Sequence, residues 1–131
     1  MLERLERLEE NIASLKVMQR RYSVEDIRNN KFDEWALRYG LLESIQIVID
    51  LACHISGKYN LGSAKTYGEC IENLQRHGYL PEAVASKLIA AVGLRNLLVH
   101  EYAVIDTEKL YGFLAFHNDF ADFIRHIADV M

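Results

Sequence analysis

The chain has 131 residues, of which 50% are hydrophobic, and its 15 Lys and Arg against 19 Asp and Glu give a formal net charge of -4. This length accommodates one domain over residues 1–131 with a real core, and it excludes two independent domains. The acidic balance excludes a general attraction to nucleic acid or to an anionic membrane, so any anion-binding site has to be local.

The two cysteines, Cys53 and Cys70, form no CxxC pair and lie in apolar or helical contexts, which supports neither a disulfide nor a zinc site. We therefore expect reduced thiols in a cytoplasmic protein. The N-terminus has charges from the third residue on and lacks the apolar region of a signal peptide. Charged residues also interrupt the most apolar windows, Asp50 in one and Lys87 and Arg95 in the other, so we expect no membrane span.

The first half of the chain has the pattern of amphipathic helices. Large apolar residues recur at spacings of three and four from residue 2 to about residue 22, which predicts a helix with one apolar stripe. Ser23, followed by two acidic residues, predicts a second helix start. Asp33 predicts a third start, leading into a long apolar helix that ends near Gly57.

Turn residues and caps divide the second half. The segment KYNLGSAKT, residues 58–66, predicts a loop, and its last residue, Thr66, can cap a shorter helix that ends at Gly78. Pro81 suits a first helical position and opens a helix that runs through residues 94–102, LRNLLVHEY.

Asp106, followed by Thr107, predicts the start of the last helix. No segment alternates apolar and polar residues over the length of a strand, and the single proline lies between helices. We therefore predict an all-α fold, an antiparallel bundle of about five helices without internal repeats.

The stretch LRNLLVHEY places a distinctive polar set in an apolar helix. With about 100° per residue, Arg95, Asn96, His100 and Tyr102 fall on one broad side, opposite the leucines. Asn96 and His100 are i,i+4 neighbours, whereas Arg95 is offset from His100 by about 140°. Three features could bring the ends of the Arg95 and His100 side chains together: the length of the arginine side chain, a break in the helix, or a partner helix related by a twofold axis.

The turns before this set carry apolar residues around the whole helix circumference: Val84, Ala85, Leu88, Ile89, Ala90, Ala91 and Val92. A helix that is apolar on all sides is buried on all sides. In a small bundle this predicts a subunit interface, and hence a homodimer with two copies of the polar set near the symmetry axis.

Histidine and arginine together suit phosphoryl chemistry. A histidine can exchange a proton near neutral pH, and an arginine can hold a phosphate through two donors. One histidine can take the proton of a ribose 2′-hydroxyl or protonate a leaving 5′-oxygen while guanidinium groups stabilise the phosphorane. This route uses no metal and no other cofactor, but an Arg and a His at this spacing also occur on helices without any catalytic role.

The pattern Arg95-Asn96-x-x-x-His100-x-Tyr102 resembles the signature of HEPN domains, and more narrowly that of the HepT branch. The surrounding text, VGLRNLLVHEYAVID, is similar to the motif segment of that family as a whole. The segments RYGLLESIQIVIDLACHI and HGYLPEAVASKL and the last helix resemble it too, so the similarity covers nearly the whole chain.

The resemblance implies an α-helical homodimer that cleaves RNA without a metal and acts as the toxin of a toxin–antitoxin pair. Arg95 would bind or stabilise the scissile phosphate, Asn96 would orient the phosphate or its partner histidine, and His100 would be the acid–base residue. The implied antitoxin is a minimal nucleotidyltransferase that attaches AMP to Tyr102, which blocks the site with bulk and negative charge. A larger assembly of the homodimer with this antitoxin stays open.

Other titratable residues receive structural interpretations. His54, four residues after Asp50, is interpreted as a core histidine with a nearby acceptor. Asp122 and His126 have the i,i+4 spacing of a metal pair, but without two further ligands we interpret them as a solvated pair. No metal site is predicted.

Aromatic and charged residues outside the motif have less specific roles. Trp35, Tyr39 and Tyr111 are interpreted as packing residues, with base stacking as an open alternative. Because the net charge is negative, the RNA surface would be confined to the dimer cleft, with candidate help from Arg38, Lys58 and Lys87. The acidic residues of the first helix predict its solvated face, with antitoxin docking there left open: Glu3, Glu6, Glu9 and Glu10.

Two other functions stay open beside the ribonuclease. The first is a non-catalytic HEPN subunit that binds nucleotide or presents a substrate in a nucleotidyltransferase complex, and such a protein could lose the Arg–His pair that this sequence keeps. The second is a helical dimerisation module, for which Arg95→Ala and His100→Ala would change neither growth nor RNA.

Overall fold

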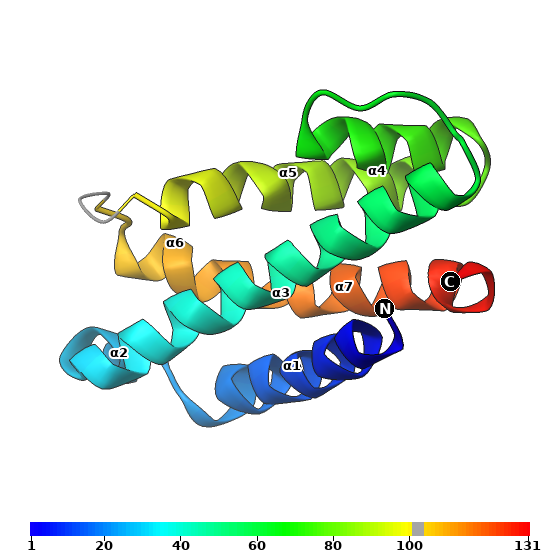
Figure 1. Ribbon diagram of the computed structural model, residues 1–131. Helices are drawn as coiled ribbons and strands as arrows, with labels where there is room; N and C mark the ends of the chain where they lie inside the picture. The colour runs from blue at the N-terminus through cyan, green and yellow to red at the C-terminus, as the bar shows by residue number, and fades with distance from the viewer. Residues whose placement is uncertain (101–103) are drawn as a thin grey trace.

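The computed structural model describes residues 1–100 and 104–131, and within those ranges it is an all-helical bundle without strands (Figure 1). The helices in chain order are α1 (Leu2–Arg21), α2 (Val24–Asn29), α3 (Lys31–Lys58), α4 (Tyr67–Arg76), α5 (Glu82–Leu98), α6 (Thr107–Gly112) and α7 (Phe116–Ile127). Short 3-10 turns follow α6 at Phe113–Ala115 and α7 at Ala128–Val130. The predicted all-α class is confirmed.

Side-chain caps begin three helices at the predicted residues. Ser23, Thr66 and Asp106 each accept a backbone N–H in the first turn of α2, α4 and α6. The long helix α3 begins earlier than predicted because the side chain of Asn30, and not that of Asp33, caps it. A polar side chain at the right position thus sets where each of these helices starts.

The long helix α3 crosses the bundle and contacts α1, α4 and α5 (Figure 1). Among the described residues it is the one helix whose length and apolarity match a membrane span, and 56% of its most apolar window is buried inside the bundle. A core helix meets the same two criteria. Its fully buried side chains include Leu37, Leu41, Ile45, Val48, Ile49, Leu51, Ala52 and Ile55.

The aromatic residues divide between the core and the surface. Tyr111 packs as predicted: its hydroxyl donates to the backbone carbonyls of Gln19 at 3.0 Å and Tyr22 at 2.6 Å. The prediction is wrong for Trp35 and Tyr39, whose exposed fractions are 52% and 63%. Both lie on the face of α3 opposite Leu37 and Leu41, which are fully buried, so the bundle covers this part of the helix on its other face.

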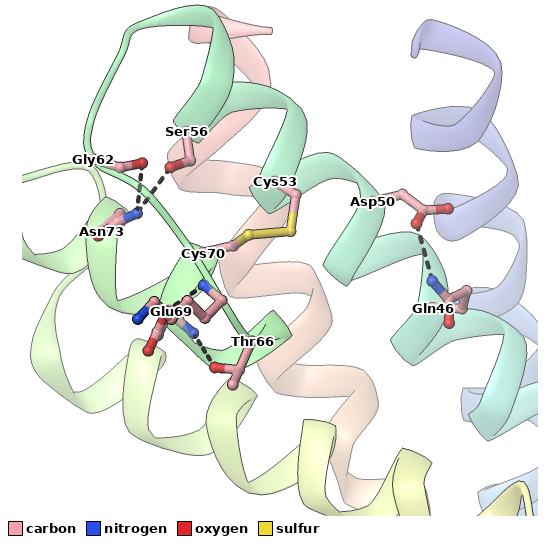
Figure 2. Close-up of a disulfide and its surroundings, with 10 residues drawn as sticks. Gln46, Asp50, Cys53, Ser56, Gly62, Thr66, Glu69, Cys70 and Asn73 are labelled. Atoms are coloured by element: carbon pink, nitrogen blue, oxygen red, sulfur yellow. Dashed lines mark hydrogen bonds between the residues drawn. A yellow bond between two sulfur atoms is a disulfide. The ribbon is translucent and has the colours of Figure 1, made fainter.

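The prediction of reduced cysteines is wrong in this structure. Cys53 on α3 and Cys70 on α4 form a disulfide whose Cα atoms are 5.0 Å apart (Figure 2). The Asn73 side-chain amide, also on α4, donates to the Ser56 hydroxyl at 3.1 Å and the Gly62 carbonyl at 3.3 Å. The cysteine spacing showed no pair because only the packing of α4 against the end of α3 brings the two thiols together.

Candidate functional site

Helix α5 carries the first two motif residues on its last turn. Its buried side faces the core, whereas Arg95 is half-buried and Asn96 is exposed. Ala90 and Leu97 are also exposed, so the described residues of one chain do not enclose α5 on all sides. The predicted burial around its whole circumference would need a second copy, and it stays a prediction.

Helix α5 ends at Leu98, earlier than predicted. The backbone N–H of Val99 donates to the Arg95 carbonyl at 3.1 Å, and His100 lies beyond this last turn. The position assigned to His100 from a regular helix is therefore wrong. Residues 94–105 contain neither glycine nor proline, so the sequence carried none of the usual signals for this helix end.

The structure joins two of the four predicted site residues directly. A terminal guanidinium nitrogen of Arg95, Nη1, donates to the side-chain carbonyl oxygen of Asn96 at 3.3 Å. His100 is exposed just after the end of α5. Tyr102 lies outside the described residues.

Contacts from α3 and α4 hold the Arg95 guanidinium in place. Its Nε donates to the Gln46 side-chain oxygen at 2.9 Å, and its Cζ lies 5.2 Å from the centre of the Tyr67 ring. The Gln46 amide donates in turn to Asp50 at 3.0 Å (Figure 2), and Asp50 pairs with Arg4 at 3.5 Å. Because guanidinium has five N–H donors, these contacts orient it and leave it able to bind a phosphate.

Sequence reasoning missed Gln46 and Tyr67. Gln46 had a usable signal, since it is an amide within the apolar run SIQIVID of α3. Tyr67 had none, because it meets Arg95 only when the start of α4 packs beside α5.

Two hollows flank this arginine. A cavity of about 550 Å³, here called the α4–α5 pocket, lies between the start of α4 and α5. A second, mostly apolar groove of about 310 Å³, here called the α3–α5 groove, lies between α3 and the end of α5. The pocket is lined by Lys65, Thr66, Tyr67, Gly68, Val92, Gly93 and Asn96. The groove is lined by Tyr39, Leu42, Glu43, Gln46, Ile47, Arg95 and Val99.

A hydrogen-bonded pair, Glu43 and Tyr39, lies at the edge of the groove. The Glu43 carboxylate accepts from the Asn11 amide at 2.9 Å and from the Tyr39 hydroxyl at 2.7 Å. These hydrogen bonds, the Asn11 one first, lower the pKa of Glu43, and the bond to Glu43 raises the pKa of Tyr39. Glu43 is therefore ionised at neutral pH and orients the exposed Tyr39 ring.

The other titratable candidates are buried, half-buried or paired with a neighbouring side chain. His117 is 6% exposed, and its Nε2 lies 2.8 Å from the Gln19 side-chain oxygen. His54 is half-buried on α3, and Asp122 pairs with Arg125 instead of His126. Within residues 1–100 and 104–131, no three His, Cys, Asp or Glu side chains gather as metal ligands would.

A family model described as Ribonuclease HepT-like matches residues 4–127, which run from the first turn of α1 to the end of α7. The chain belongs to the HepT-like ribonuclease family. Among its relatives is the tRNA nuclease HepT of Aphanizomenon flos-aquae (strain 2012/KM1/D3), which is 32% identical over 88 residues. The match covers 66% of this chain and 60% of that relative, so it spans less than two thirds of the relative's length.

Solved structures share the fold of this HepT-like chain. The tri-AMPylated HEPN toxin of Shewanella oneidensis in complex with MNT antitoxin has a TM-score of 0.87 at 19% identity, covering 98% of this chain and 96% of that one. YutE of Bacillus subtilis, a cytosolic protein of unknown function, has a TM-score of 0.74 at 16% identity, covering 95% and 87%. At these identities the likeness establishes the helical architecture.

Proposed function

We propose that this chain is the ribonuclease toxin of a toxin–antitoxin pair, acts in the cytoplasm as a single domain over residues 1–131, and cleaves RNA through Arg95, Asn96 and His100. One observation carries the proposal: in a chain that matches the HepT-like ribonuclease family, Arg95 and Asn96 lie on the last turn of α5 and the exposed His100 follows just beyond it. The related tRNA nuclease HepT supports RNA as the substrate class.

The proposed reaction is transesterification followed by release of a 5′-hydroxyl product. His100 removes the proton of a ribose 2′-hydroxyl, whose oxygen attacks the adjacent phosphorus. The bond from phosphorus to the 5′-oxygen breaks, and His100 of the partner subunit protonates the departing oxygen, leaving a 2′,3′-cyclic phosphate. Arg95, oriented by Gln46 and Asn96, stabilises the negative charge of the phosphorane. Proton transfer and charge stabilisation come from these side chains, so the proposed route is metal-independent.

A homodimer would supply the second acid. The α3–α5 groove is mostly apolar and contains Arg95, and the exposed side chains of Tyr39 and Val99 line it. Leu97, 44% exposed, lies on the same last turn of α5. Exposed apolar surface of this kind favours a protein partner. A second copy on this groove would bring the two Arg95 side chains near one symmetry axis and form one composite site.

The proposed antitoxin is a minimal nucleotidyltransferase that silences the toxin by attaching AMP to Tyr102. The structural neighbours support this partner, because they include an AMPylated HEPN toxin with MNT antitoxin and a toxin–antitoxin complex with AMP-PNP. Tyr102 is two residues after His100 in the sequence. An added phosphate there would place negative charge close to the residues that bind the RNA phosphate.

The test is cleavage of total RNA and purified tRNA by the purified chain with EDTA present. Wild type, Arg95→Ala and His100→Ala are compared, and the product ends are identified. We expect cleavage that survives chelation, leaves 2′,3′-cyclic phosphate and 5′-hydroxyl ends, and is lost in both variants. Equal products from all three proteins would refute the assigned residues, and loss of cleavage in EDTA would refute the metal-independent route.

A further inference from the structure

The α4–α5 pocket shares Asn96 with the proposed site but extends away from it toward the start of α4. We propose that this pocket binds the unstacked base of the nucleotide next to the scissile phosphate, with the Tyr67 ring as the stacking platform. The inference rests on the proposed ribonuclease function and names single-stranded RNA as the form of substrate.

The pocket lining suits a nucleotide electrostatically. Among its lining residues are one cation, Lys65, and no carboxylate, although the chain as a whole has a net charge of -4. The Glu69 carboxylate at the start of α4 accepts from the backbone N–H of Lys65 and lines a different hollow. A phosphodiester entering the pocket therefore meets positive charge and no acidic lining residue.

Tyr67 connects the pocket to the proposed phosphate site. Tyr67 lines the pocket and is 45% exposed, and the Arg95 guanidinium carbon lies 5.2 Å from the centre of its ring. An aromatic ring next to a guanidinium is the combination that single-stranded nucleic acids use, because the base stacks while the cation holds the phosphate. The amide of Asn96 offers a donor and an acceptor to the base edge at the same wall.

The pocket has room for a base and its ribose. Its volume of about 550 Å³ lies within the range of small-molecule sites. A Cβ atom built on Gly93, in the α5 wall, would meet no atom within 4 Å. A larger side chain at position 93 would therefore fill the pocket without displacing neighbouring atoms.

A direct test is the affinity for fluorescein-labelled 2′-O-methyl oligoadenylate, which cannot be cleaved through its 2′-oxygen, compared with an abasic oligomer of equal length. We expect wild type to prefer the base-bearing oligomer by about tenfold, as stacking of one base on an aromatic ring predicts. Tyr67→Ala should lose this preference and Tyr67→Phe should keep it. Gly93→Leu, which fills the pocket, should also lose it.

Gly112→Leu is the matched control, because a Cβ at this other helical glycine also meets nothing within 4 Å and Gly112 does not line the pocket. Circular dichroism melts of all variants verify folding. An unchanged base preference in both Tyr67→Ala and Gly93→Leu would overturn the proposal. If, in addition, Gly93→Leu weakened binding of the nucleotidyltransferase antitoxin, the pocket would belong to a protein contact instead.

The ribonuclease proposal and the base-pocket proposal can be refuted independently. A base preference that depends on Tyr67, in a protein that cleaves no RNA, would refute the ribonuclease and keep the pocket. Cleavage that depends on His100, together with a base preference independent of Tyr67, would keep the ribonuclease and refute the pocket.

Discussion

Polar side chains join helices at several places in this molecule, and two of these regions use them differently. Where α6 and α7 meet α1, His117 and Tyr111 are directed inward and bond to Gln19 and to the carbonyl of Tyr22. Where α5 meets α3 and α4, Arg95 is only half-buried, between an amide and an aromatic ring.

The difference separates polar groups that hold the fold from polar groups that can meet a ligand. Burial takes His117 away from solvent and substrate, so its hydrogen bond contributes to stability. His100 is exposed just beyond α5, where a histidine can exchange protons with a bound molecule. Histidine is therefore expected to stabilise the fold in the first region, at position 117, and to act in catalysis in the second, at position 100.

The strongest way to break this comparison is to remove each histidine in turn. We expect His100→Ala to lower cleavage by about 100- to 10,000-fold, the usual contribution of acid–base catalysis, with an unchanged melting temperature. We expect His117→Ala to leave cleavage within a few-fold of wild type and to cost about 1–3 kcal/mol of unfolding free energy, because it leaves Gln19 without its buried partner. Cleavage time courses and urea unfolding measure the two effects, and an exchange of the two phenotypes would contradict the assignment.

The disulfide should matter for stability more than for chemistry. Cys53 and Cys70 are separated by 17 residues, and opening a loop of that size costs about 3 kcal/mol. We expect Cys53→Ser with Cys70→Ser, or wild type in dithiothreitol, to unfold at lower urea concentration by this amount. Ser56→Ala gives a control on the same turn, since it removes one hydrogen bond from Asn73 and leaves the disulfide intact. Equal stability with and without reductant would show that the disulfide contributes nothing to the free energy of unfolding.

Gln46 tests whether Arg95 has to be oriented from α3. Gln46→Leu has a similar volume but cannot accept from the Arg95 Nε or donate to Asp50. We expect kcat/KM for RNA to fall about tenfold, on the order of 1.4 kcal/mol in the transition state, while stability changes by less than about 1 kcal/mol. Gln46→Glu should retain part of the activity because it still accepts from Arg95. A kcat/KM unchanged in Gln46→Leu would remove Gln46 from the site.

The smallest expected effect is a pH dependence of stability that comes from His117. Burial, together with the positive charge of Lys16, lowers the pKa of His117 below its ordinary value of 6.5. The unfolded chain then binds more protons than the folded chain, so the stability contributed by neutral His117 is present above about pH 6.5 and is lost as pH falls below it. Urea unfolding from pH 7.5 to 5 should show a steeper loss in wild type than in His117→Gln. An equal dependence of stability on pH in the two proteins would contradict the lowered pKa of His117.

The sequence by itself determined the helical class and the starts of α2, α4 and α6, but not the start of α3. Ser23, Thr66 and Asp106 cap where predicted because an N-cap bond is made within a single turn, so local sequence suffices. The motif segments that resemble the family are also contiguous in the sequence. The end of α5 was not predictable, because apolar spacing continues past Leu98 without a glycine or proline.

Only the tertiary structure decided which groups meet. Arg95 has its Gln46 partner 49 positions away, Tyr67 reaches the guanidinium from another helix, and the cysteines pair only once α4 lies on α3. The exposure of Tyr39 likewise depends on which face of α3 the other helices cover. Residue types and spacing limit the chemistry available to this chain, whereas contacts between distant segments arise from packing, and packing selects the groups that surround the proposed site.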